Sequence, residues 1–362
     1  MKHFYLILLF ITSIAFAQIP SNYYDSATGS GYTLKTQLHN IINGHTDNGY
    51  GGLYTTYETS DRDSYYEMNG TVLDMYSEKP SGTDSYEYTY EIEMPNDDRD
   101  PGSGGTIEGE YYNREHIIPQ SIFSSATPMR SDAHFVVPSD KFVNAQRGSF
   151  PFGVVDTPNW TSTNGSKRGN NLNSGYSAGY TDTVFEPISE FKGDIARMFF
   201  YFVTRYEDNV ASWSYTMFNG TSDQVFDLTF FNILYQWHID DPVSTREIDR
   251  NDAIYLRQNN RNPFIDHPEY VASIWSNLLS TNENDFLKNV SIYPNPIKDN
   301  DLNIKTRTPL HIEIYNVLGK LILTSKVDAY NKTVNVSSLK QGVYLIKLNS
   351  EQGSITKKLI KQ

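Results

Sequence analysis

A change of composition near residue 288 divides the chain into two parts of opposite charge. Residues 289–362 contain 11 Lys and Arg and 5 Asp and Glu, whereas residues 1–288 contain 19 and 38. The length of 362 residues also exceeds what one ordinary domain holds. We therefore expect two folded units on one chain, an acidic unit followed by a basic one.

The first 17 residues have the pattern of a secretory signal peptide. The apolar run "FYLILLFITSIAFA" follows Lys2 and ends in the small residues Ala15 and Ala17, which form a site of the kind that signal peptidase cleaves. The run is shorter than the roughly 20 residues that span a bilayer, and nothing comparable follows it. We therefore predict that residues 1–17 are removed and that the mature chain is exported without a stable membrane span.

The chain contains no Cys, which restricts both its fold and its chemistry. An exported chain of this kind has no disulfide framework and must be held together by an apolar core. Thiol catalysis and Cys-ligated zinc are excluded, so a metal site would use oxygen and nitrogen ligands. Aromatic residues make up 14% of the chain and include 27 Tyr, which is enough to supply such a core.

The basic unit has the pattern of a small β-sandwich. Apolar and polar residues alternate in seven short segments from "VSIYPNP" to "SITKKLIK", separated by breaks such as Pro-Asn-Pro and Leu-Gly-Lys. The stretches "YPNP" at 293–296, "YNVLGK" at 315–320 and "LKQGVYLIKL" at 339–348 resemble the C-terminal sorting domain of type IX secretion. The resemblance implies export across the outer membrane by the type IX secretion machinery. A plain adhesive sandwich is the alternative.

The acidic unit shows mixed patterns, and the predicted fold class is α+β. Apolar residues at helical spacing predict helices over 33–45, 188–208 and 267–279, the first ending at Gly44 and the third with Pro268 in its first turn. Residues 95–110 and 160–182 are rich in Gly, Asn, Asp, Ser and Pro and predict long loops.

Two polar segments of the acidic unit are the candidates for chemistry. They are "YYNREHIIPQSIF" at 111–123 and "MRSDAHFVVPSDKFVNAQRGSFPFGVV" at 129–155. In each, polar residues run into an apolar, strand-like stretch that ends in proline, and the second stretch continues through Ser139 or Asp140, as helix N-cap, into "KFVNAQRG". This order predicts strand, loop, strand and helix, with Asn144 and Arg147 on one helix face.

The residue types in these segments suit phosphodiester hydrolysis. A Glu carboxylate and an Asn amide oxygen are hard ligands that suit Mg²⁺, Mn²⁺ or Ca²⁺. A neutral His can take a proton from water, and an Arg fork can hold phosphate oxygens. Glu115 and His116 are adjacent and would point to opposite sides of a regular strand, so the strand must end or bend there. A surface ion pair in "NREH" is the structural alternative.

Four blocks of the acidic unit resemble the endonuclease I family, secreted or periplasmic non-specific nucleases with a ββα-metal finger. The blocks are "YYNREHIIPQSIF", "RSDAHFVVPSDKFVNAQRGSFPFGVV", "FKGDIARMFFYFVTRY" and "WHIDDPVSTREIDRNDAIYLRQNNRNPFIDHPEYVASIW". The resemblance implies that Glu115 and Asn144 bind one ion, Mg²⁺ or else Mn²⁺ or Ca²⁺, and that His116 is the general base. It implies an Arg on the cleaved phosphate, for which we choose Arg130 and keep Arg147 in reserve.

The same resemblance places Asp132 and His134 on the second strand, where we expect them to shape the finger by hydrogen bonds. We assign no role to the polar block "RQNNRNPFIDHPEY" at 257–270, which is at least as well explained as an internally bonded loop.

The sequence therefore predicts a signal peptide at 1–17, a nuclease domain at 18–286 and a sorting domain at 287–362. The expected protein is a monomeric, secreted or cell-surface, metal-dependent endonuclease. It would cleave DNA, with RNA as a further substrate, and leave 5′-phosphates. Acidity argues against this function, because nucleic-acid binding favours basic surfaces and residues 41–110 contain 16 Asp and Glu and only 3 Lys and Arg. The alternatives are a calcium-dependent binding module and a phosphodiesterase for another ester.

Overall fold

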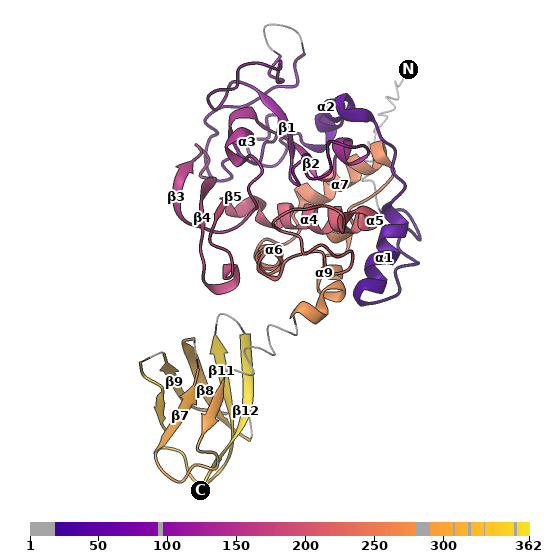
Figure 1. The fold of residues 1–362 in the computed structure, drawn as a ribbon. Coiled ribbons are helices and arrows are strands. Elements are labelled where there is room, and N and C mark those ends of the chain that lie inside the picture. Colours follow the sequence, from indigo (N-terminus) through magenta and orange to yellow (C-terminus); the bar gives the residue numbers. More distant parts are fainter. Residues whose placement is uncertain are drawn as a thin grey trace, which may run out of the picture.

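Two separate hydrophobic cores divide the computed structural model into two units (Figure 1). The structure describes residues 19–92, 97–279, 290–306, 308–317, 320–328, 330–350 and 353–362. The larger core draws its buried residues from Leu34 to Leu278, and the smaller one from Val290 to Leu359. The predicted signal peptide lies outside the described residues. Within the described ranges, no helix combines the length and the apolarity needed to cross a membrane.

The larger unit mixes helices with two small sheets. Its elements, in chain order, are α1 (Gly31–Ile42), α2 (Gly49–Ser60), β1 (Tyr112–His116), the 3₁₀ turn η1 (Met129–Ser131), β2 (Val136–Asp140), α3 (Lys141–Arg147), β3 (Val155–Thr161), β4 (Lys167–Asn171), the 3₁₀ turn η2 (Gly175–Ser177), β5 (Thr183–Glu186), the 3₁₀ turn η3 (Ser189–Phe191), α4 (Lys192–Arg205), α5 (Glu207–Val210), α6 (Leu228–Asp240), α7 (Thr245–Gln258), α8 (Pro263–Asp266) and α9 (Tyr270–Ile274).

Helix α4 lies near the centre of this unit, among the other helices (Figure 1). Every residue from Gly193 to Arg205 is buried, which explains the dense apolar run "MFFYFV". Its two internal charges are paired with α7, because Arg197 binds Glu247 and Asp194 binds Arg246. Paired charges are the usual condition for burying such groups.

The predicted helices are found, with changes at their ends. The first ends at Ile42 under an Asn43 cap in right-handed conformation, so the prediction of a Gly44 cap is wrong. The second is divided into η3, α4 and α5. The third is interrupted at Trp275, and Pro268 precedes α9 instead of lying in its first turn.

The predicted order of strand, loop, strand and helix is confirmed. Strands β1 and β2 pair antiparallel, with Glu115 opposite Val137 and His116 opposite Val136, and α3 follows directly. Strand β2 continues beyond the end of the apolar stretch at Pro138, through Ser139 to Asp140. The predicted loop at 160–182 is also wrong, because it contains β4, the centre of the sheet β3-β4-β5.

The smaller unit is the predicted all-β sandwich. Its strands are β6 (Ser291–Tyr293), β7 (Asp301–Lys305), β8 (Leu310–Asn316), β9 (Leu321–Val327), β10 (Thr333–Asn335), β11 (Gly342–Ser350) and β12 (Gly353–Lys361). They form one sheet of order β10-β7-β6 and one of order β12-β11-β8-β9. Alternate residues of β8 (Leu310, Ile312 and Ile314) are buried, as the period of two requires.

Candidate active site

Strand β1 presents two pairs of polar residues to opposite sides. Asn113 and Glu115 contact α3, since Asn113 Oδ1 accepts a 2.8 Å hydrogen bond from Asn144 and Glu115 lies 3.3 Å from Arg147. Arg114 and His116 contact the ring of Tyr50 instead. This division follows from the period of two in a strand. The strand ends at His116, as the adjacency of Glu115 and His116 requires if both are to reach one substrate.

Helix α3 is fixed by its first and last residues. The Asp140 carboxylate is the N-cap and accepts a 2.8 Å hydrogen bond from the Val143 N–H. At the other end Arg147, which is 1% exposed, donates to the carbonyl groups of His116 and Ile117. Its guanidinium therefore holds the end of β1. Because Arg147 is buried and bonded to these carbonyl groups, it is not exposed to a substrate phosphate, for which it was the reserve candidate.

Glu115 is a buried carboxylate with two partners. It is 2% exposed, and its Oε1 accepts a hydrogen bond of 3.1 Å from the Tyr76 hydroxyl and lies 3.3 Å from Arg147 Nη1. Burial raises the pKa of Glu115 to about 7, although Arg147 and Tyr76 act in the opposite direction. A carboxylate in this environment gains from a bound cation, because the cation offsets the cost of burying its charge.

His116 is held as a neutral base. Its Nε2 lies 3.1 Å from the Arg130 carbonyl oxygen, which can only accept, so Nε2 carries the proton and Nδ1 is left with a lone pair. Burial lowers the pKa of His116 to about 4, and the charges of Arg114, Arg130 and Arg147 act in the same direction. The ring is therefore neutral at pH 7, the state that can accept a proton.

Two guanidinium groups lie over one aromatic ring beside His116. The Cζ atoms of Arg114 and Arg130 are 3.5 and 4.2 Å from the Tyr50 ring centroid, and the His116 ring stacks on Tyr50 at 6.0 Å. Both arginines are partly exposed. Tyr50, from α2, thus positions two cations next to the candidate base.

We call β1, β2 and α3 together the finger. Asp132 and His134 lie just before β2, not on the strand itself. Asp132 accepts hydrogen bonds from the hydroxyl groups of Tyr201 and Tyr206, at 2.9 and 2.8 Å. His134 Nε2 donates to the Asn260 carbonyl at 3.0 Å. Both residues are buried, so they anchor the finger to the helical core.

The block at 257–270 is internally bonded as well. Arg261 is 1% exposed and donates to both carboxylate oxygens of Asp266, at 2.7 and 2.8 Å. Asn262 caps α8. Gln258 and Asn260 bond outside the block, to Asp132 and to the Tyr201 hydroxyl, so this part of the chain supports the fold.

The donor set of the finger fits a hard divalent cation. The Nδ2 of Asn144 is turned toward Asn113, which leaves the amide oxygen as the atom that can bind a cation. Together with the Glu115 carboxylate it provides oxygen ligands only, which Mg²⁺, Mn²⁺ and Ca²⁺ prefer. The residues present therefore fit the ion that the resemblance implies.

Two residues of this region carry no signal in the sequence. Tyr50 and Tyr76 lie 66 and 39 positions before His116 and Glu115, which they contact. In a chain with 27 Tyr, neither spacing nor composition distinguishes them from core aromatics.

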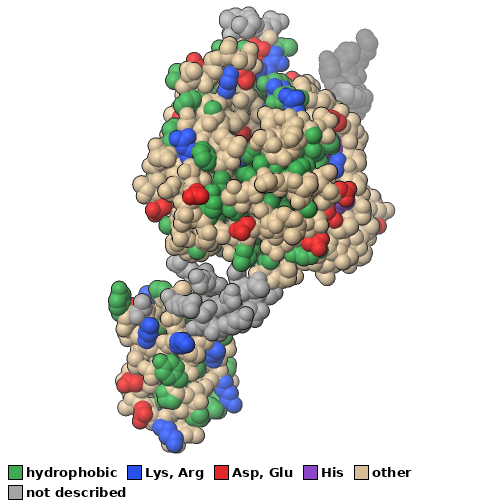
Figure 2. Space-filling view, in the orientation of Figure 1, with side chains coloured by type: hydrophobic (Ala, Val, Ile, Leu, Met, Phe, Trp, Pro, Cys, Tyr) green, Lys and Arg blue, Asp and Glu red, His purple; other side chains and the backbone are tan. Residues whose placement is uncertain are grey.

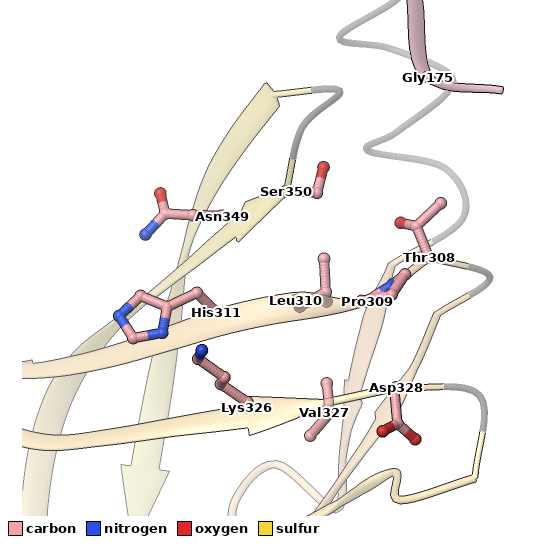
Figure 3. A pocket seen from close by; sticks show the side chains of 10 residues that line it. All are labelled: Gly175, Thr308, Pro309, Leu310, His311, Lys326, Val327, Asp328, Asn349 and Ser350. Carbon is pink, nitrogen blue, oxygen red and sulfur yellow. The ribbon is translucent and has the colours of Figure 1, made fainter. Parts of the chain in front are cut away.

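A pocket in the smaller unit is separate from the finger. It is lined chiefly by strand ends of the sandwich, including Leu310, His311, Lys326, Val327 and Asn349 (Figure 3). It contains none of the residues that the sequence analysis selects, so it does not compete with the finger as the site of chemistry.

Comparison with known proteins agrees with the two-unit organisation. Residues 30–269 match endonuclease I, and residues 291–362 match the secretion system C-terminal sorting domain. The extracellular ribonuclease of Bacillus amyloliquefaciens is 33% identical over 259 residues, which cover 70% of this chain and 78% of the relative. That of Bacillus subtilis (strain 168) is 32% identical over 259 residues, with the same coverage.

The fold, the finger and these relatives together define a secreted nuclease with a type IX sorting domain. The candidate residues lie on β1 (Glu115 and His116), η1 (Arg130) and α3 (Asn144). The chain belongs to the endonuclease I family.

Proposed function

We propose that this nuclease is a divalent-metal-dependent, non-specific endonuclease that leaves 5′-phosphates. His116 is the general base, and Glu115 and Asn144 hold the single ion, Mg²⁺ in the first place. The observation that carries the proposal is the state of His116: its Nε2 is bound to the Arg130 carbonyl, and burial lowers its pKa to about 4. A base held in this tautomer offers Nδ1 to a water molecule.

His116 takes a proton from the attacking water at Nδ1. The Arg130 carbonyl keeps the proton on Nε2 throughout, and the imidazolium that forms is stabilised by that same acceptor. Proton transfer by a positioned side chain contributes about 10²–10⁴-fold to a rate. The lowered pKa of His116 keeps the base available at neutral and mildly acidic pH.

Arg130 and Arg114 hold the substrate phosphate beside His116. Their guanidinium groups lie against Tyr50, and an Arg fork donates two parallel hydrogen bonds to phosphate oxygens. The ion, when bound, stabilises the negative charge that develops on the phosphate. Arg147 is occupied by backbone carbonyls and Glu115, so we assign the phosphate to Arg130 and not to Arg147.

Both DNA and RNA are proposed substrates. The family is a family of endonucleases, and the two curated relatives are extracellular ribonucleases. On the face of the larger unit in Figure 2, basic side chains stand apart from one another and form no continuous band. Residues 1–288 contain 19 Lys and Arg against 38 Asp and Glu, so binding would rest on few phosphate contacts and would weaken further as salt rises.

The test is cleavage of supercoiled plasmid and of single-stranded RNA by the mature full chain, with Mg²⁺ and with EDTA. His116→Ala should lower the Mg²⁺-dependent rate by about 10²–10⁴-fold and leave the circular dichroism spectrum unchanged. His267→Ala is the matched control, because His267 is bound to Glu269 away from the finger and its loss should leave the rate unchanged.

The product ends provide a second measurement. Fragments with a 5′-phosphate can be joined by a DNA ligase without prior treatment by a kinase. Retention of more than a tenth of the rate in His116→Ala, or cleavage that persists in EDTA, would contradict the proposal.

A further inference from the structure

A cluster of carboxylates lies in the acidic part of the larger unit, outside the finger. Oxygen atoms of Asp63, Glu67 and Glu78 lie within 4.8 Å of one another, and so do those of Glu67, Asp84 and Glu87. The two groups share Glu67. Like charges at this separation repel one another, and the repulsion is greatest where water is excluded.

Within this cluster, Glu78 has a buried carboxyl oxygen without a hydrogen-bond partner. It is 2% exposed, and its Oε1 has no hydrogen-bond partner. Burial, followed by the charges of Asp84, Glu67 and Asp63, raises the pKa of Glu78 to about 9. Native proteins satisfy nearly all buried polar atoms, so a buried carboxylate oxygen that points into an acidic cluster indicates a missing partner.

The neighbouring cations of the protein are not that partner. Lys79 Nζ donates to the Ser85 hydroxyl, and Arg62 lies over the Tyr90 ring. Among the described residues, no Lys or Arg forms an ion pair with any of the five carboxylates. Without an ion, a proton neutralises Glu78, because its pKa is raised to about 9. A cation from solution would bind here by displacing that proton.

We propose that Asp63, Glu67 and Glu78 bind a divalent cation, Ca²⁺, at a structural site distinct from the finger, with Asp84 and Glu87 adding negative charge around it. Ca²⁺ takes oxygen ligands at 2.3–2.6 Å, so two oxygens on one ion lie at most about 5 Å apart, and one oxygen of each of the three residues lies within 4.8 Å of the others. Mg²⁺ keeps several waters and demands near-octahedral geometry, which suits a cluster of closely packed carboxylates less well.

The loop that carries two of these ligands is already shaped for binding. The Asp63 carboxylate accepts hydrogen bonds from the N–H groups of Tyr65, Tyr66 and Met68, at 3.0, 3.0 and 2.8 Å. These bonds fix the turn that brings Glu67 beside Asp63. Asp63 Oδ1 accepts two of these bonds and Oδ2 accepts one, which leaves a lone pair of Oδ2 for a cation.

The site is linked to the finger through one short segment. Within residues 74–78, Asp74 accepts from the Asp140 N–H at 2.8 Å, Tyr76 donates to Glu115, and Glu78 supplies the proposed ligand. An ion at Glu78 therefore fixes the end of the segment that positions Tyr76 against Glu115. Its loss should loosen that contact.

The experiment uses the mature full chain carrying Glu115→Gln, so that the finger ion does not contribute. Ca²⁺ binding is measured by calorimetry, and unfolding by Trp fluorescence after treatment with EDTA. We expect one bound Ca²⁺ and a rise in Tm of about 5–10 °C at roughly 100 times the Kd. Adding Glu78→Gln should abolish both effects, because an amide oxygen replaces the carboxylate that would bind the ion.

Glu58→Gln is the control, because it makes the same substitution at an exposed Glu on α2, outside the cluster. It should keep the Ca²⁺-dependent shift, whereas Glu67→Gln, the second variant of the site, should lose it. The proposal is overturned if the Glu115→Gln protein binds no Ca²⁺, if Glu78→Gln and Glu67→Gln keep the shift, or if Mg²⁺ alone produces it. Because nuclease activity is not the readout, these outcomes are independent of the function proposed for the finger.

Discussion

Replacing Arg147 by Met should destabilise the larger unit by about 3–5 kcal/mol, the usual cost of removing one partner of a buried ion pair. Arg147 is 1% exposed and Glu115 is 2% exposed, with 3.3 Å between Arg147 Nη1 and Glu115 Oε1. Met fills a similar length without charge, so Glu115 is left buried and unpaired. The carbonyl groups of His116 and Ile117 also lose their donor.

The cost should depend on pH. Burial raises the pKa of Glu115 to about 7, and Arg147 opposes this rise, so the pKa rises further in the variant. When a carboxyl group has a higher pKa in the folded state than in the unfolded state, the folded protein loses stability as pH rises. The loss begins near the unfolded-state pKa, about 4.5, and continues through the folded-state pKa. We therefore expect a smaller loss at pH 5, where Glu115 keeps its proton, than at pH 8.

Urea unfolding followed by Trp fluorescence measures this directly. All four Trp, at positions 160, 213, 237 and 275, lie in the larger unit, so the signal does not report on the sandwich. Adding Glu115→Gln to Arg147→Met should recover part of the lost stability, because it removes the unpaired charge. A loss below 1 kcal/mol with abolished cleavage would refute this reasoning and indicate that Arg147 binds the phosphate.

Three further predictions concern the finger. Arg130→Ala should lower the cleavage rate by roughly 10²-fold. It should not change stability in the same urea assay, because the backbone carbonyl that accepts the hydrogen bond from His116 remains. An unchanged cleavage rate would contradict this prediction. Raising the Mg²⁺ concentration should move the acid limb of the pH–rate profile to lower pH, because the ion competes with the proton on Glu115, whose pKa burial raises to about 7. His116 does not set this limb, since its pKa is lowered to about 4. An acid limb that does not move would exclude Glu115 as a ligand. Burial opposes the charge on Asp132, but nearby imidazoles and hydrogen bonds lower its pKa to about 2 from 3.8, so Asp132→Asn should cost about 2 kcal/mol at pH 7. That difference should vanish as pH falls from about 4 to 2, and equal stability at pH 7 would contradict it.

The finger could be predicted because its parts are local in the sequence. Only 24 residues separate the end of strand β1 from the start of helix α3. The Asp140 cap and the spacing of Asn144 and Arg147 follow from helix geometry alone. The seven strands of the sandwich are predictable for the same reason, since a period of two reports one buried face. The roles of Glu115, His116 and Asn144 stay predictions until cleavage is measured.

The sheet β3-β4-β5 could not be predicted from local pattern. In β3 only Val155 is buried, and Pro158 lies within the strand, so neither alternation nor propensity marks it. The Gly, Asn and Ser residues of 160–182 favour turns, and pairing with β5 overrides that preference.

The sequence by itself determined the two units, the order of elements in the finger and the residue types available to it. Only the tertiary structure decided that Arg147 is buried while Arg130 is partly exposed, and that Tyr50 and Tyr76 contact His116 and Glu115. It also gathered carboxylates from residues 63–87 into one cluster. The physical reason is range: hydrogen bonding and side-chain periodicity act over a few residues, whereas burial and charge depend on neighbours that only the folded chain brings together.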